Sequence, residues 1–350
     1  MPHAIRPLRS IASTFAIMAI ALAPIASHAQ QERGDWKLYY EAEKQRIQLN
    51  FEDFDYRQWQ VGTSFSANSR TLDGLSVSQI EGPTSQVRFR IRRDAGTFNF
   101  EGSVGNMRGR GTFEFNPNPS FRDELARRGY SRPSESQQFH LALHDVNLAF
   151  IDELRAQGYS RPTTSDLVRM GQHGVTYDYI RGMAALGYKL DHVDDLVNMR
   201  DHGVTPAYVS ALRDAGYTKL SARRLVELRD HGVTPDFIAS LRSAGFERMS
   251  DDELVRMRDH GVTPSYISGM KTLGYNLSAE ELVGARDHGV TPGFVEGFQK
   301  LGYRNLTIDQ LIQLRDHGVT ASYAARARDR ARSRPSITEL IRARDRGYDF

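Results

Sequence analysis

Six histidines recur between residues 173 and 317 at intervals of 28 or 29 residues, and imidazole is a common metal ligand that also exchanges protons near neutral pH. A metal site requires several ligands at about 2 Å from one ion. Equivalent positions of stacked helical repeats, however, lie about 8–10 Å apart. We therefore predict a ladder of separate histidines and no metal site, the members of the ladder being His173, His202, His231, His260, His288 and His317.

The histidines stand in a recurring motif whose full form, Arg-Asp-His-Gly-Val-Thr-Pro, occupies residues 229–235. The glycine after the histidine is a typical helix stop, so the histidine is expected to end a helix. A protonated imidazole at that end is stabilised by about 0.3–1 kcal/mol. We interpret the histidines as helix-terminal cationic or hydrogen-bonding residues with a structural role. A proton-sensing ladder is the alternative.

An aspartate precedes five of the histidines, which is unexpected because a carboxylate near a helix C-terminus faces the negative end of the helix dipole. We predict that these aspartates pair with arginines of the same or the next repeat, or with backbone N–H groups of the following helix, in a structural role. The aspartates are Asp201, Asp230, Asp259, Asp287 and Asp316. The arginines are Arg200, Arg229, Arg258, Arg286 and Arg315.

A period of about 29 residues is typical of stacked units of two short helices. In the repeat that begins at Thr205, this threonine is a natural N-cap and Pro206 stands at the first helical position. Gly216 is expected to end this helix in a left-handed conformation. Ser221 then begins the second helix. The apolar stripe of the first helix consists of Tyr208, Val209, Leu212 and Ala215.

The same signals extend over residues 116–350, in which we count eight helix pairs, with first helices from about residue 120 and second helices from about residue 134. Capping boxes are expected at Ser250 with Glu253, Ser278 with Glu281, Thr307 with Gln310 and Ser336 with Glu339. One position of the first helix is always small, which indicates close approach to a neighbouring helix. The small residues are Gly182, Ala211, Ser240, Gly269, Gly297 and Ala325.

Residues 30–115 have a different period. Apolar residues alternate with polar ones along residues 47–52, 87–92, 98–101 and 113–115, which predicts half-buried antiparallel strands. A tight turn is expected at residues 94–96, and the glycine-rich segment from Gly102 to Gly111 is expected to connect the next pair of strands. We expect four to six strands with one aromatic-lined face, packed on itself or on the first helices. The fold class is therefore α+β, a small antiparallel β domain followed by an α-solenoid of about eight two-helix repeats.

The first 29 residues resemble a signal peptide. They contain Arg6 and Arg9, an apolar run from Ile11 to Ala23, and small residues at 27 and 29 before a cut at Gln30. An uncleaved membrane anchor is the alternative, although the run is shorter than the ~20 residues that span a bilayer. We expect a location in the periplasm or outside the cell.

Composition and motifs limit the chemistry. The chain has no cysteine, which excludes disulfides and thiolate metal sites, and its net charge is +3. It contains no zinc-protease, phosphate-loop, serine-hydrolase or dinucleotide motif. We assign no catalytic residue, no cofactor and no nucleic-acid partner, and expect a protein that is not an enzyme.

Two arginine-rich segments are candidate anion surfaces. Arg88, Arg90 and Arg92 are expected on one face of a strand, and Arg328 and Arg332 belong to the basic C-terminal repeat. The alternative for each segment is a solvated face without a binding role. In that interpretation, Asn99 and Glu101 are the cross-strand neighbours of the strand arginines. The functional interpretation is peripheral contact with an anionic membrane surface or another polyanion.

The residue after the N1 proline differs between repeats, as expected of a partner-binding surface. The candidates are Ala207, Asp236, Ser265 and Gly293. Because solenoids present extended surfaces, we expect a non-enzymatic interaction or scaffold protein whose array binds a protein partner. Binding of anionic envelope surface through the arginines is the alternative, and an enzyme that uses the β domain is a third.

With the repeat defined, the chain resembles bacterial extracytoplasmic proteins whose helical repeats carry the pattern Leu-Val-x-x-Arg-Asp-His-Gly-Val-Thr-Pro-x-Tyr-Ile, seen at residues 254–267 and, with Phe237 for tyrosine, at 225–238. Residues 92–98 are similar to the β domain that precedes such arrays. Similar repeats follow membrane zinc-peptidase domains of the β-lactam-sensor type. The resemblance implies a sensory or scaffolding setting. This chain lacks the peptidase motif and its membrane helices, so no catalytic residue carries over.

Overall fold

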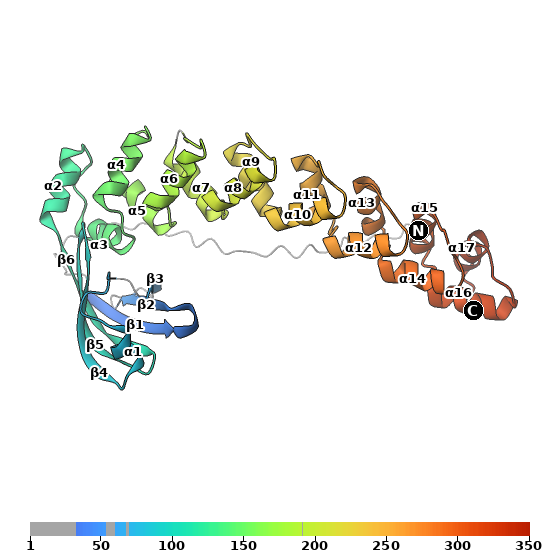
Figure 1. Cartoon of the computed structure of the whole chain (residues 1–350), viewed down its shortest axis with the longest axis horizontal. Helices are drawn as coiled ribbons and strands as arrows, with labels where there is room; N and C mark the ends of the chain where they lie inside the picture. The colour runs from blue at the N-terminus through green and yellow to red at the C-terminus, as the bar shows by residue number, and fades with distance from the viewer. Residues whose placement is uncertain (1–32, 54–59, 68–69, 191) are drawn as a thin grey trace, which may run out of the picture.

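The computed structural model describes residues 33–350 apart from residues 54–59, 68–69 and 191. The expected signal peptide at residues 1–29 lies outside the described residues. Figure 1 shows a curled sheet at one end of the molecule, from which a long double row of helices extends. The architecture is therefore the small antiparallel β domain and helical solenoid that the sequence predicts.

The described strands form one antiparallel sheet of six strands in the order β3-β2-β1-β6-β5-β4, at the upper limit of the predicted four to six. Their bounds are β1 Arg33–Glu41, β2 Arg46–Asp53, β3 Gln60–Ser66, β4 Ser85–Arg93, β5 Gly96–Gly105 and β6 Arg108–Pro117. A 3-10 turn, Ala42–Lys44, joins β1 to β2, and the short helix α1, Val77–Glu81, precedes β4. The predicted tight turn is present between β4 and β5, where Arg93 pairs with Gly96.

The glycine-rich segment between residues 102 and 111 is mostly strand, so the prediction of a connecting loop was wrong. Gly102 pairs with Gly111 inside the β5–β6 ladder, and the turn is confined to Asn106 and Met107, both with positive φ. A Cβ on Gly111 would lie 2.0 Å from the Glu101 carbonyl oxygen, and one on Gly102 would lie 2.2 Å from that of Arg110. These glycines therefore allow close approach of two strands.

The sheet packs both on itself and on the first helices. Phe89 and Phe100 stack at 4.5 Å inside the curl. Phe139 of α3 closes the curl, with its ring 5.5 Å from Phe98 and 5.4 Å from Phe115. The β domain and the start of the array therefore share one core.

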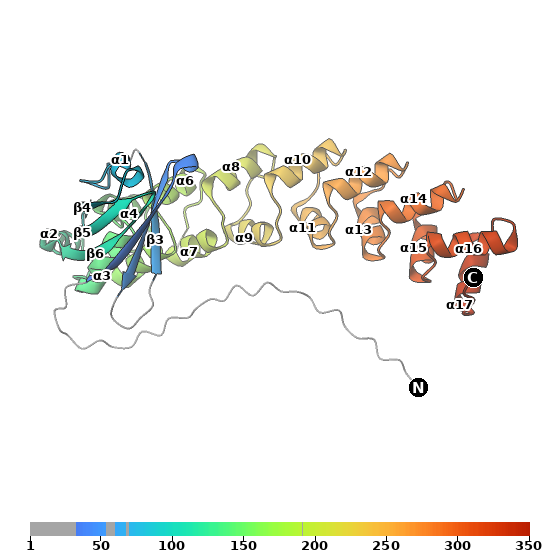
Figure 2. The ribbon, with the colours of Figure 1, turned by 90° about the horizontal axis from the view of Figure 1, so that it is seen from below.

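Sixteen helices follow in the described part of the chain and form the eight predicted pairs. The first helices are α2 Pro119–Arg127, α4 Leu148–Ala156, α6 Tyr177–Ala185, α8 Pro206–Asp214, α10 Pro235–Ser243, α12 Pro264–Thr272, α14 Pro292–Lys300 and α16 Ala321–Ala331. The second helices are α3 Glu135–Leu143, α5 Thr164–Gln172, α7 Val193–Asp201, α9 Ala222–Asp230, α11 Asp251–Asp259, α13 Ala279–Asp287, α15 Ile308–Asp316 and α17 Ile337–Asp345. From α6 to α16 the first helices make one row and the second helices another (Figure 2).

Helix ends follow the local signals closely. The Thr205 hydroxyl accepts a hydrogen bond from the Tyr208 N–H, and Gly216 ends α8 with φ of 87°. The Tyr217 N–H then reaches back to the Leu212 carbonyl at 2.9 Å, which completes the predicted C-terminal motif. All four predicted capping boxes are present.

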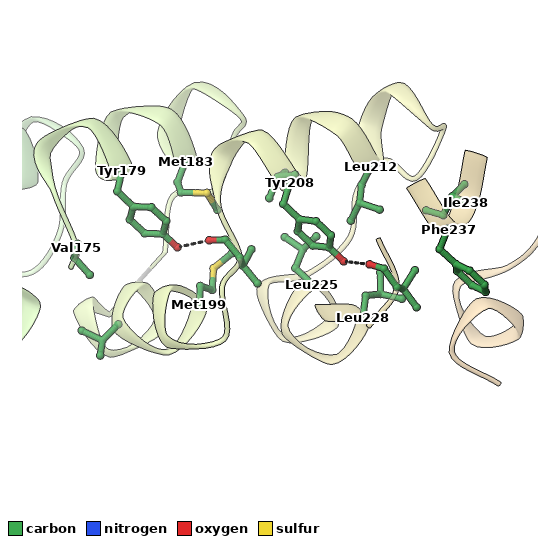
Figure 3. Close-up of a cluster of buried hydrophobic side chains, with 14 of the residues drawn as sticks. Val175, Tyr179, Met183, Met199, Tyr208, Leu212, Leu225, Leu228, Phe237 and Ile238 are labelled. Carbon is green, nitrogen blue, oxygen red and sulfur yellow. Dashed lines mark hydrogen bonds between the residues drawn. The ribbon is translucent and has the colours of Figure 1, made fainter. Parts of the chain in front are cut away.

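The predicted column of small residues packs against the next repeat from Gly182 to Gly297. Ala325 was wrongly included, because the equivalent position of α16 is Arg326. A Cβ on Gly182 would lie 2.7 Å from Pro206 Cγ, and one on Gly269 would lie 2.8 Å from Pro292 Cγ. At these two glycines, the N1 proline of the next first helix thus occupies the space that a larger residue would need, and Ala321 takes this place beside Gly297. Figure 3 shows the apolar core that runs between the two rows. Within the described residues, no helix combines the length and apolar character required to cross a bilayer.

Candidate interaction surface

The six histidines form a ladder with aspartates of the next repeat. Each histidine is the C-cap residue of a second helix, and its Nδ1 lies 2.6–2.8 Å from a carboxylate oxygen. The pairs are His173–Asp201, His202–Asp230, His231–Asp259, His260–Asp287, His288–Asp316 and His317–Asp345. The structural role predicted for the histidines agrees with this position at the helix ends.

The predicted Arg–Asp ladder was wrong. Each aspartate is the last residue of its second helix, so its carboxylate reaches the histidine that ends the preceding second helix. The partial positive charge of an Nδ1–H donor, or the full charge of imidazolium, offsets the unfavourable helix-dipole position of the carboxylate.

The arginines of the motif contact the preceding repeat in another way. The Arg200 Nε donates to the Gly174 carbonyl at 2.9 Å, and its guanidinium lies 5.6 Å from the centre of the Tyr179 ring. The side chain therefore satisfies a carbonyl at a helix end and stacks on an aromatic face. Equivalent cation–π pairs are Arg229–Tyr208, Arg258–Phe237, Arg286–Tyr266, Arg315–Phe294 and Arg344–Tyr323.

The tyrosine two residues after the N1 position bonds the first helix to the segment that follows the second helix of the same repeat. Figure 3 shows the Tyr179 hydroxyl donating to the Val204 carbonyl, and the Tyr208 hydroxyl donating to that of Val233. Burial raises the pKa of Tyr208 to about 12, while nearby Arg229 lowers it, so the hydroxyl remains a donor. The repeated motif therefore serves contacts inside the array, within a repeat in the case of Tyr208–Val233 and between repeats in the case of His231–Asp259. Residues that face a partner are expected elsewhere.

The candidate partner residues lie in register on the exposed side of the first-helix row. Ala207, Asp236, Ser265 and Gly293 are each the second residue of α8, α10, α12 and α14, and all four are exposed. Other exposed residues of these helices continue the surface toward the helix ends. We define the outward face as these four together with Asp214, Ala239, Ser243, Ser268, Thr272, Glu296 and Lys300.

The arginines of β4 are paired with carboxylates. Arg88 contacts Glu101 at 2.9 Å, and Asp73 contacts both Arg90 at 2.9 Å and Arg92 at 3.1 Å. The predicted neighbours are present, because Arg88 lies opposite Glu101 and Arg90 opposite Asn99. Asp73 was not predicted, since it comes from the segment before α1. This face is thus exposed and largely neutralised.

In the basic C-terminal repeat, one of the two candidate arginines is paired with a carboxylate. The Arg328 guanidinium contacts Asp329 at 2.9 Å. Arg332 follows α16 in a left-handed conformation and is exposed. The two arginines therefore do not form an unopposed positive stripe. In the part of the chain that the structure describes, no group of three or more metal-ligating side chains converges.

One cleft near the first repeats was not predicted from the sequence. Its volume is about 170 Å³, and it is formed by the end of α2, by α4 and by the loop after α4. The available signal was the departure of these two repeats from the motif of the later ones. The polar and aromatic residues of its lining are Arg128, Tyr130, Asp152, Arg155, Tyr159 and Arg161.

Compared with known proteins, the chain matches no protein-family model and shows no significant similarity to a curated sequence.

Proposed function

We propose that this chain is a non-enzymatic scaffold protein, acting outside the cytoplasm, whose solenoid binds a protein partner along the outward face. One observation carries the proposal. The polar groups of the repeated motif are used inside the array, between repeats in His231–Asp259 and within one repeat in Arg258–Phe237, whereas the exposed residues of the first helices differ from repeat to repeat. Stacked repeats that vary on one exposed row present an extended surface with a distinct pattern.

The chemistry of the outward face favours a protein over a repetitive ligand. The same position holds Ala207, Asp236, Ser265 and Gly293 in successive repeats, so a ligand with one identical contact per repeat would meet four different side chains. These side chains are short, which lets a partner approach the helices closely. A folded protein or an extended peptide supplies the varied contacts that such a row requires.

The alternative function, binding of anionic lipid headgroups or another envelope polyanion, has less support. Its strand arginines, Arg88, Arg90 and Arg92, have carboxylate neighbours, and Arg328 has Asp329. An anion would have to displace these pairs. Such binding would also weaken strongly as salt screens the charges.

The test is capture of partners from envelope extract by the full chain at low and at high salt, with site-specific photo-crosslinking at positions 207, 236 and 265. We expect a discrete protein to be retained at high salt and to crosslink at these positions. The double variant Ala207→Arg/Ser265→Arg should reduce its capture about tenfold or more, because two bulky charges would interrupt the contact.

The matched control places arginine on the second-helix row, at the exposed residues Asn198 and Gln313. Asn198→Arg/Gln313→Arg should leave capture unchanged. Retention of the partner by the outward-face variant and its loss in the control would contradict the proposal. Recovery of lipid or polyanion alone, lost at high salt, would support the alternative function.

A further inference from the structure

At four successive interfaces of the array, a side chain of one first helix donates to the carbonyl that ends the preceding first helix. The donors and acceptors are Arg213 to Leu186, Arg242 to Ala215, Lys271 to Ala244 and Gln299 to Leu273. Arg155 of α4 occupies the same position as Arg213, because each is the eighth residue of its helix. Within the described residues, however, Arg155 has no hydrogen-bond or ion-pair partner, and it lines the cleft at the end of α2.

Tyr130 likewise lacks the hydrogen bond that the equivalent tyrosines of later repeats make. In four first helices, the residue after the terminal glycine is a tyrosine that donates its hydroxyl to a carbonyl of the next repeat. The pairs are Tyr188–Leu220, Tyr217–Met249, Tyr275–Leu306 and Tyr303–Pro335. Tyr130 follows Gly129 at the end of α2 and is the equivalent residue. Its hydroxyl has no partner among the described residues, and the side chain lines the cleft.

Of the three arginines that line the cleft, Arg128 is held by carboxylates. Arg128 donates from Nε and from Nη2 to the two carboxylate oxygens of Asp152, at 2.8 and 3.0 Å, and it also contacts Glu124. These pairs neutralise its charge and orient its guanidinium. Arg161 makes only a long contact of 3.4 Å to the Gly129 carbonyl. Asp152 also lines the cleft, and its pKa is lowered first by the Arg128 hydrogen bond and to a smaller extent by the charge of Arg155. Among the described residues, Arg155 and Arg161 form no ion pair, so the net positive charge of the cleft comes from these two side chains.

We propose that this cleft binds a phosphate monoester dianion. Two guanidinium groups without carboxylate partners match its two negative charges, and their planar N–H groups fit phosphate oxygens in pairs. The Tyr130 hydroxyl supplies a further donor, and the Tyr159 ring supplies a wall for the carbon atoms next to the ester oxygen. A cleft of about 170 Å³ is smaller than a typical drug-sized pocket, so it holds the anionic head and little more of the ligand.

The site does not depend on the outward face, which lies on later repeats. The phosphate monoester has two possible sources, a soluble compound or the headgroup of a phospholipid. The probes are inorganic phosphate and glycerol 3-phosphate for the first source, and phosphatidylcholine vesicles with and without phosphatidic acid for the second. Binding is measured by titration calorimetry and by vesicle co-sedimentation with the full chain at about 0.15 M salt, which screens non-specific attraction.

The variants are Arg155→Gln and Arg161→Gln. Neither arginine makes a strong contact in the folded chain, so both variants should melt like the parent protein. Arg248 occupies the same loop position as Arg161 in a later repeat and is exposed, so Arg248→Gln is the matched control. We expect saturable binding of glycerol 3-phosphate or of phosphatidic acid vesicles, reduced about tenfold or more by each cleft variant and unchanged by the control.

Two outcomes would overturn the proposal. One is the absence of saturable binding for all of these probes. The other is equal loss of binding in Arg248→Gln and Arg161→Gln, since this would show that overall positive charge is responsible. Binding of the soluble ester supports the soluble source, and binding confined to vesicles that contain phosphatidic acid supports the lipid headgroup.

Discussion

Two regions of the molecule place the same repeat in different surroundings: the regular array from α6 to α15, and the junction from α2 to α5, which meets the sheet. In the array, second helices end in Arg-Asp-His, and each histidine contacts an aspartate of the next repeat. At the junction, α3 ends in Ala142-Leu143-His144, and Gln172 stands where α7 has Asp201. His144 consequently lacks the carboxylate that its equivalents have.

The surroundings explain why motif residues are replaced at the junction. His144 packs against α5, where a Cβ on Gly171 would lie only 2.8 Å from His144 Cβ. Gln138 of α3 stands where α9 has the buried Leu225. Its amide donates to the carbonyls of Ala95 and Asn118, at 2.6 and 2.7 Å, and so joins α3 to the sheet.

The comparison teaches where to look in a repeat array. A position keeps the motif residue when its neighbour is another repeat, and changes when its neighbour is the sheet. Arg155 and Tyr130, which retain the motif residue type but lack the motif contact, are therefore more informative than the regular ladder. The following predictions test this distinction.

The largest effect is expected from acid at the junction. Burial, with nearby His140, lowers the pKa of His144 to about 4, against about 6.5 in the unfolded chain. The unfolded state therefore binds more protons between these values, and stability falls as pH falls through this window. The loss should approach 3 kcal/mol by about pH 4. Hydrogen exchange of the α3 amides between pH 7 and pH 4 measures it.

Two variants separate this effect from general acid sensitivity. His144→Phe removes the titrating group and should flatten the pH dependence of exchange in α3. His231→Gln, at the equivalent half-exposed position of the array, should leave α3 unchanged. A parent protein whose α3 amides exchange with the same protection at both pH values would show that His144 is not responsible.

A smaller effect on the free energy of unfolding should distinguish Tyr217 from Tyr130. The Tyr217 hydroxyl donates to the Met249 carbonyl at 2.8 Å, so Tyr217→Phe should cost about 1 kcal/mol. Tyr130→Phe should cost less than about 0.5 kcal/mol, because no described residue accepts its hydroxyl proton. Denaturant unfolding, monitored by amide exchange in the helices next to each site, measures both. Equal costs for the two variants would contradict the assignment of Tyr130 as unpaired.

Much of the fold was predictable because its signals are local. Thr205, Pro206 and Gly216 specify the start and end of α8 within a dozen residues, and the same three signals recur at α10, α12 and α14. Partners across repeats were not predictable in this way. Asp259 lies 28 residues from His231, and only the stacking of the second helices brings them together.

The candidate site was predictable only in part. Exposure of residues such as Ala207 follows from helix periodicity, because the apolar stripe determines which side faces the core. The carboxylates that neutralise the β4 arginines include Asp73, which precedes α1 and reaches Arg90 through an isolated bridge. The cleft could be recognised only from the structure. Arg155 lacks the hydrogen bond that Arg213 donates to a carbonyl, and no pattern in the residue types reveals this difference.

The smallest effect per interface belongs to the histidine ladder. The side chains of His231 and Asp259 are 37% and 44% exposed, so their coupling should be only about 0.2–1 kcal/mol and should weaken with added salt. A double-mutant cycle with His231→Gln and Asp259→Asn measures it. Coupling well above 1 kcal/mol would contradict the description of an exposed pair, and no coupling would remove its structural role. Because the stability of a solenoid is a sum over its interfaces, six such pairs together contribute about 1–6 kcal/mol, a range that includes the effect expected of His144 alone in acid.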